Sequence, residues 1–74
     1  MSERWGYIAI NKVGVYSLCE DLPGDLGRAA ADFVARALNL GHRVERVPVA
    51  EAVERHLAYL RQDPKMAALI DAKR

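Results

Sequence analysis

Apolar side chains recur at three- and four-residue spacing between Asp25 and Gly41, which is the pattern of a helix with one apolar face. The apolar positions are Leu26, Ala30, Phe33, Val34, Ala37 and Leu38. Asp25 is placed to cap the free N–H groups at the start, and Gly41 can adopt the left-handed conformation that ends a helix. The stretch predicts the central helix of the fold, with Phe33 and Leu38 as buried anchors.

Residues 5–19 alternate between two sets of side chains, as β-strands do, and β-branched and aromatic residues are frequent in both sets. Asn11 and Lys12 interrupt the alternation, and Gly14 can supply the positive φ of a bulge just after the turn. We therefore expect a hairpin with a loop of three or four residues. One long bent strand is the alternative.

The alternation places Trp5 and Tyr7 on one face of the first strand, and Ile8 and Ile10 on the other. If helices cover only one face of so small a sheet, one of these two sets stays exposed or contacts a partner.

Pro23 and Gly24 break the second strand and lead into the central helix, after which residues 42–49 return to a strand. Pro48 has no backbone N–H, so it ends this third strand or confines it to the edge of a sheet. If the second and third strands share a sheet, the connection through the helix makes them parallel.

Two more helices are expected after the third strand. Residues 50–62 form an amphipathic pattern, with Glu51 and Arg55 at the four-residue spacing that favours an ion pair. Asp63 and Pro64 then supply an N-cap and a first helical residue for a shorter helix. The predicted fold is a small α+β domain with a three-stranded sheet and the order β-β-α-β-α-α.

The composition indicates one globular domain over residues 1–74, with 51% hydrophobic and 28% charged residues. A domain this small buries only about 60% of the surface that its unfolded chain exposes, so its core is thin. Cys19 is the single cysteine, which excludes a disulfide within the chain, and one cysteine with two histidines does not make a structural zinc site. We therefore predict no metal and no cofactor, and expect oligomerisation to supply stability.

The distribution of apolar residues argues against a membrane partner. No apolar run approaches the roughly 18 residues that a membrane-spanning helix needs. The first residues contain no apolar segment behind a basic start, so no export signal is recognised and a cytoplasmic location is expected.

Three residues are candidates for nucleophilic catalysis, and each has a simpler interpretation. Cys19 is followed by Glu20 and Asp21, whose negative charge disfavours a thiolate. His42 fits the C-terminal end of the central helix, and His56 fits the border of an apolar stripe. The glycines do not form a phosphate-binding loop. We predict that the chain is not an enzyme and has no catalytic residues.

The charge balance weakens the case for nucleic-acid binding but does not exclude it. The net charge is +1, from eleven basic and ten acidic residues, which gives no sustained positive field. Arg28, Arg36 and Arg43 are the best candidates for phosphate contacts. Asp32 lies four residues from both Arg28 and Arg36, which predicts a ladder of ion pairs on the exposed face of the helix. A nucleic-acid-binding regulator, antitoxin- or repressor-like, is therefore the alternative function.

The run Leu22-Pro23-Gly24, between a hairpin and an alanine-rich helix, resembles the turn of HicB-type antitoxins. In that family a strand ends in a similar turn before the helix. The resemblance covers only the hairpin, the turn and the start of the helix, and it implies a regulator that binds a protein partner and DNA. The chain departs from the family pattern, because the helix follows Asp25 directly and leaves no room for the family's additional short strand.

The function that these observations favour is protein–protein contact without catalysis. We expect a homodimer or a regulatory or inhibitory subunit of a larger complex, because the sheet and the last helix carry more apolar residues than one helix layer can cover. The candidate interface residues are Trp5, Tyr7, Met66 and Ile70.

Overall fold

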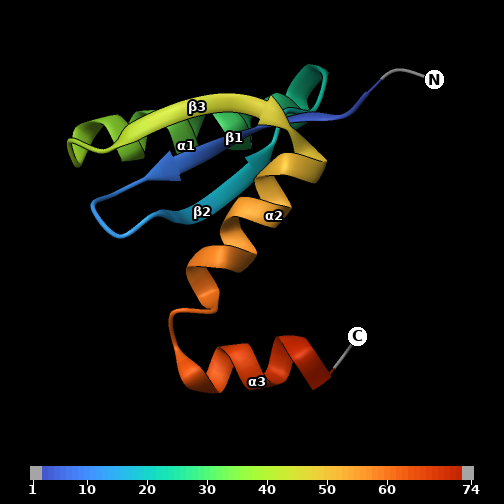
Figure 1. The fold of residues 1–74 in the computed structure, drawn as a ribbon. Coiled ribbons are helices and arrows are strands. Elements are labelled where there is room, and N and C mark those ends of the chain that lie inside the picture. The colour runs from blue at the N-terminus through green and yellow to red at the C-terminus, as the bar shows by residue number, and fades with distance from the viewer. Residues whose placement is uncertain (1–2, 73–74) are drawn as a thin grey trace.

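The computed structural model describes residues 3–72 and shows, in that range, an α+β fold with one three-stranded sheet (Figure 1). The elements are β1 (Trp5–Ile10), β2 (Val15–Glu20), the 3-10 turn η1 (Gly24–Gly27), α1 (Arg28–Asn39), β3 (Arg43–Pro48), α2 (Val49–Leu60) and α3 (Pro64–Ala72). The predicted fold class and order of strands and helices are confirmed, and no strand lies between the hairpin and α1.

The strand order is β2-β1-β3, and β1 is antiparallel to both of its neighbours. Therefore β2 and β3 run parallel, as predicted for strands joined through the helix, although β1 lies between them. Both β2 and β3 are edge strands, and β3 ends at Pro48, as predicted.

A loop of four residues, Asn11 to Gly14, joins β1 and β2. The Asn11 side-chain oxygen Oδ1 accepts hydrogen bonds from the N–H of Val13 at 2.8 Å and of Gly14 at 3.0 Å. Gly14 has a φ of +146°, and the strand register shifts between Ala9 and Ile10, which marks a bulge. The predicted hairpin, loop length and glycine conformation are confirmed.

The start of the central helix differs from the prediction. Gly24, with a φ of +65°, turns the chain into η1, so α1 begins at Arg28. Asp25 lies inside η1, and no side chain caps the start of η1 or of α1, so the predicted Asp25 cap is wrong. Gly27 allows this tight entry, because a Cβ there would lie 2.8 Å from the Leu22 carbonyl oxygen.

The end of α1 is as predicted. Gly41 has a φ of +76°. The Gly41 N–H donates to the Leu38 carbonyl and the His42 N–H donates to the Ala37 carbonyl, each at 3.0 Å. This pair of bonds is the Schellman pattern, which satisfies the last carbonyls of a helix.

Local predictions for α2 and α3 are also confirmed. Arg55 lies 4.0 Å from Glu51 in the expected ion pair. The Asp63 carboxylate accepts a hydrogen bond from the Lys65 N–H at 2.9 Å, so Asp63 caps α3, with Pro64 as the first helical residue.

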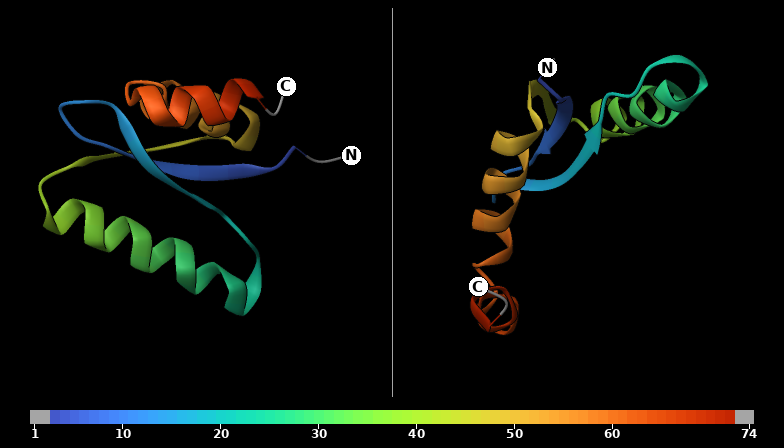
Figure 2. Two further views of the ribbon diagram at one scale, coloured as in Figure 1. Left: turned by 90° about the horizontal axis from the view of Figure 1, so that it is seen from below. Right: turned by 90° about the vertical axis from the view of Figure 1, so that its right-hand side faces the viewer.

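The helices α1 and α2 lie on opposite faces of the sheet (Figure 2), and each contacts all three strands. Ile8 is fully buried, at 0% exposure, on the α2 face. It packs there in a cluster with Val15, Val47 and Ala52. Because helices cover both faces, neither face of the sheet is left exposed. Trp5 and Tyr7 are half-buried on the α1 face.

Alanines form the contact between α1 and the sheet. Ala30 and Ala37, seven positions apart, are 2% exposed, whereas Phe33 is half-buried and Leu38 is 58% exposed. The prediction of Leu38 as a buried anchor is therefore wrong, and Phe33 is only partly enclosed. The small alanine side chains let α1 approach the sheet closely, which leaves the larger residues on its flanks.

Candidate protein interface

The outer edge of β2 is open to pairing with another strand. The Asp21 N–H donates to the Trp5 carbonyl at 2.9 Å, in line with the register of β1 and β2. In an antiparallel ladder, hydrogen-bonded and non-hydrogen-bonded pairs alternate. Cys19 therefore bonds to β1, whereas the N–H and C=O groups of Leu18 and Glu20 point away from the sheet.

The outer edge of β3, in contrast, is protected. The Val49 N–H donates to the Arg4 carbonyl at 2.9 Å, so the same alternation directs Pro48 outward, where its nitrogen has no hydrogen to donate. The charged residues of β3 are Arg43, Glu45 and Arg46. Charges and proline on an edge strand prevent pairing with other chains. In β2 only the last residue, Glu20, is charged, and there is no proline.

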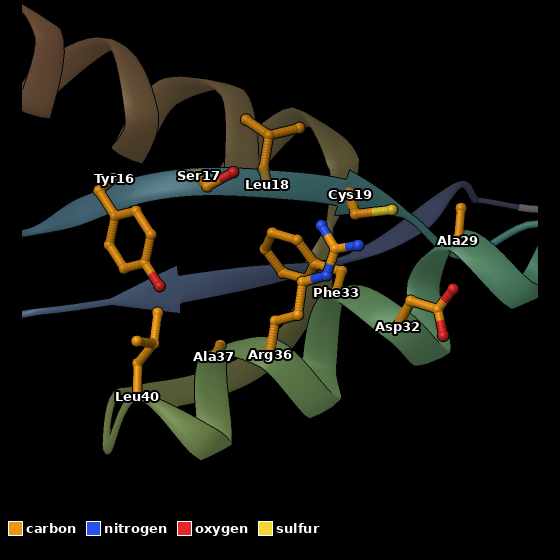
Figure 3. Close-up of a pocket in the computed structure, with 10 residues that line it drawn as sticks. All are labelled: Tyr16, Ser17, Leu18, Cys19, Ala29, Asp32, Phe33, Arg36, Ala37 and Leu40. Atoms are coloured by element: carbon orange, nitrogen blue, oxygen red, sulfur yellow. The ribbon is translucent and has the colours of Figure 1, made fainter.

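A groove of about 540 Å³ runs between β2 and α1 (Figure 3). Its β2 side is formed by Tyr16 to Cys19, and its helix side includes Phe33 and Leu40. Leu40 is 66% exposed at the rim. A strand added to the β2 edge would thus lie beside apolar side chains as well as free backbone groups, which is the usual basis of β-strand recognition.

Asp32 and Arg36 stand on the helix side of this groove, and both are exposed. Within residues 3–72 neither forms an ion pair, nor does Arg28, so the predicted ladder along α1 is wrong. Figure 3 shows the reason, since the Arg36 side chain extends toward β2 across Phe33 rather than along the helix toward Asp32. Both charges remain available to a partner.

The two histidines connect other elements to β2. A carbonyl oxygen can only accept, so the His56 Nδ1–H donates to the Val15 carbonyl, at 2.9 Å. His42 Nδ1 and the Tyr16 hydroxyl are hydrogen-bonded at 2.7 Å. No hydrogen bond within the described part of the chain joins Cys19 to either histidine, so a nucleophile and its base are not assembled.

The four interface residues predicted from the sequence do not form one surface. Trp5 and Tyr7 lie on the α1 face, and the guanidinium carbon of Arg46 is 4.8 Å from the Trp5 ring centre. Met66 and Ile70 lie on α3, which contacts only α2 among the described elements and stands beyond it in Figure 1. An interface that includes all four stays a prediction and would require separate contacts.

The arginines considered for nucleic acid are also dispersed. Arg28 begins α1 and Arg43 follows its end, so a 12-residue helix, about 18 Å long, separates them. Arg43 is paired with Glu45 at 2.9 Å. Arg36 is exposed in the groove of Figure 3. The three side chains therefore do not converge on a single phosphate path.

The described residues show no other assembled site. Among residues 3–72, no three His, Cys, Asp or Glu side chains gather closely enough to hold a metal ion. In the same range, no helix has the length and apolar character to cross a membrane.

Comparison with protein-family models, with curated protein sequences and with solved structures found no match. The geometry of β2 and α1 is therefore the basis for assigning a role.

Leu18, through its outward backbone groups, and Leu40, at the rim of the groove, are candidate interface residues that the sequence pattern did not reveal. The signal in the sequence is the lack of proline and lysine in the run Val-Tyr-Ser-Leu-Cys-Glu. The lack of these residues indicates an edge that can pair with another strand only once the strand order shows that β2 is an edge strand.

An ion pair stands at the end of β2. Arg4 Nε and Nη2 donate to the Glu20 carboxylate oxygens at 2.6 and 2.5 Å. The hydrogen bond from Arg4, together with its positive charge, lowers the pKa of Glu20 below its ordinary value. A lowered carboxyl pKa stabilises the fold above the unfolded-state pKa, and this stabilisation is lost as the pH falls through the folded-state pKa.

We expect Arg4→Gln to raise the pKa of Glu20 toward its ordinary value, because the hydrogen bond and the positive charge of Arg4 are lost. An NMR titration of the Glu20 carboxyl carbon in both proteins measures the change. Because the pair is exposed, stability at neutral pH should hardly move. An unchanged Glu20 titration in the variant would show that the ion pair does not form in solution.

Proposed function

We propose that this chain is a non-catalytic interaction protein that acts through protein–protein contact, as a homodimer or as a regulatory or inhibitory subunit of a larger complex. Its binding surface is the outer edge of β2 together with the groove beneath α1. The observation that carries this proposal is the contrast between the two sheet edges. The edge strand β3 carries three charged residues and Pro48, whereas β2 has no proline and one charged residue, Glu20, and its bulge is confined to its start at Tyr16.

Two further observations support binding by strand addition. The groove places two apolar residues, Phe33 and Leu40, beside the outward backbone groups of β2. Backbone hydrogen bonds to a partner strand would supply affinity, and contacts with these apolar side chains would supply specificity. The core is also small, since Ile8 is the one large side chain among the described residues that is fully buried. A partner strand would add hydrogen bonds and apolar contacts that stabilise a fold whose own core is small.

Site-specific photo-crosslinking tests this proposal. A benzophenone-bearing amino acid at Leu40, which is 66% exposed at the groove rim, should crosslink to protein in the cells that produce the chain. The matched control is the same amino acid at Val53, which is 41% exposed on α2 and away from the groove. Crosslinks from Leu40 but not from Val53 support the proposal. Absence of any Leu40 crosslink, both in cells and in purified protein, contradicts it.

We expect no binding of DNA or RNA at physiological salt, because the candidate arginines are dispersed and the net charge is only +1. Fluorescence anisotropy with labelled DNA and RNA measures this directly. Submicromolar binding that is lost when Arg28, Arg36 and Arg43 are all changed to Glu would instead support the nucleic-acid-binding regulator.

A further inference from the structure

We infer that α2 closes the first part of the β2 edge, so that a partner strand can pair only with the second part, from Ser17 to Glu20. The two side chains that impose this restriction are His56, on α2, and Gln62, just after it. The inference rests on the proposed function, because it specifies where along the same edge a strand can pair and limits the length of that strand.

The backbone groups of Val15 point outward from the sheet and yet are covered. Because β1 lies between two strands, its residues bond alternately to β2 and to β3. Ala9 bonds to Ser17 of β2, so the next residue, Ile10, bonds to β3. Val15 lies opposite Ile10, and its N–H and C=O therefore point outward. Although it lies at the edge of the sheet, Val15 is only 4% exposed, so another element covers it.

The covering element is α2, whose C-terminal end extends past β2 in both Figure 1 and Figure 2. His56 Nδ1–H donates to the Val15 carbonyl at 2.9 Å. Gln62 Nε2 donates to the Val13 carbonyl at 3.0 Å. The imidazole and the amide thus satisfy these backbone acceptors from within the chain, and they occupy the space from which a partner strand would have to donate.

Packing of α2 against the hairpin holds His56 in this position. A Cβ at Gly14 would lie 3.6 Å from Tyr59 Cδ2, so Tyr59 is in van der Waals range of the hairpin backbone. The Tyr59 ring also stacks on the His56 ring, with ring centres 6.1 Å apart and planes at 11° to each other. The orientation of the imidazole is therefore set by Tyr59 at its face and by the Val15 carbonyl at Nδ1.

The bulge in β2 closes the edge at the next residue. Tyr16 is the extra residue, because the residues on either side of it pair with consecutive residues of β1. The Tyr16 hydroxyl is hydrogen-bonded to His42 Nδ1 at 2.7 Å, which ties the bulge to the end of α1. A bulge interrupts the regular spacing of outward backbone groups, so a strand paired at Leu18 loses register at Tyr16. The open part of the edge then consists of the N–H and C=O groups of Leu18 and Glu20.

The tautomer of His56 tests the cap on Val15 directly. A carbonyl oxygen can only accept, so neutral His56 must carry its proton on Nδ1. Nitrogen-15 NMR of the unmodified protein at about pH 8, above the ordinary pKa of histidine, distinguishes the Nδ1–H from the Nε2–H form. The Nδ1–H form is the expected result. A predominant Nε2–H form would overturn the inference, because the Val15 carbonyl would then have no cap.

Two substitutions of similar shape test whether the cap restricts the edge. Asparagine places an amide N–H where His56 has Nδ1–H, whereas leucine places a methyl group there. We expect His56→Leu to free the Val15 carbonyl and to strengthen self-association of the purified chain roughly tenfold or more, because unprotected edges pair with one another. His56→Asn should associate like the unmodified protein. Sedimentation equilibrium measures the association of each variant.

The matched control is Glu54→Leu, which adds the same apolar side chain to the exposed side of α2. Circular dichroism verifies the fold of each variant, and the tautomer measurement decides the question without any variant. Association of His56→Leu no stronger than that of Glu54→Leu or His56→Asn would overturn the inference. If that result is obtained while a probe at Leu40 crosslinks in cells, the β2 edge remains the interface and only its boundary is wrong. If the cap is found but Leu40 forms no crosslink, the proposed function is wrong and the closure of the edge by α2 stands.

Discussion

Replacement of Ile8 by alanine is expected to lower the free energy of unfolding by about 2–5 kcal/mol, the range for removing a large buried aliphatic side chain. Ile8 is 0% exposed and packs between Val15, Val47 and Ala52, so the surrounding strands and helix have little freedom to close the cavity. Since small domains are stable by roughly 5–15 kcal/mol, much of the stability would be lost. Urea unfolding followed by circular dichroism measures the change.

Phe33→Ala is the informative comparison for Ile8→Ala. Phe33 is half-buried beside the groove, so its loss should cost less stability than the loss of Ile8, while weakening self-association. A larger loss of stability from Phe33→Ala than from Ile8→Ala, with association unchanged, would mean that the α1 face and not the α2 face holds the main core.

A charge reversal at the groove is expected to have the second-largest effect, on association rather than on folding. Arg36→Asp reverses the exposed charge that extends toward β2 in the groove, so we expect binding of a partner strand at this edge to weaken by roughly tenfold or more, about 1.4 kcal/mol. Asp32→Arg should weaken it similarly. Sedimentation equilibrium at low and high salt measures the effect, which should shrink as salt screens the charges.

Glu54→Lys, on the exposed side of α2, is the control that changes net charge away from the groove. If Glu54→Lys weakens binding as much as Arg36→Asp does, the effect reflects net charge and not a contact in the groove.

Local features of the fold could be predicted because neighbouring residues determine them. Gly14 and Gly41 adopt the positive φ values expected of them, and Asp63 caps α3. Pro48 ends an edge strand. In each case the backbone geometry of one residue, or a hydrogen bond within a few residues, is sufficient to determine the structure.

Packing between elements could not be predicted in the same way. Hydrophobicity ranks Leu38 above Ala37, yet Ala37 is buried and Leu38 is exposed, because a close helix–sheet approach favours the smaller side chain. The spacing of Asp32 and Arg36 likewise permits an ion pair, but Arg36 extends over Phe33 instead. These outcomes depend on three-dimensional neighbours that periodicity does not identify.

The candidate interface depends on strand order, which the sequence left open. The contrast between an uncharged β2 and a charged β3 is visible in the sequence, but it matters only because β1 lies between them and leaves both edges free. The predicted interface of Trp5, Tyr7, Met66 and Ile70 rests on apolar excess alone. Apolar patterning does not report the outward backbone groups of the β2 edge.

Amide hydrogen exchange at the β2 edge is the most direct test of the interface. The N–H groups of Leu18 and Glu20 point outward, so their exchange should slow markedly as protein concentration rises and the edge becomes paired. The Cys19 N–H bonds to β1 and should be protected at every concentration, which makes it the internal control. Concentration-dependent protection of Leu18 and Glu20 is the predicted result. Exchange of both at the unprotected rate up to millimolar concentration, while Cys19 stays protected, would contradict self-pairing at this edge.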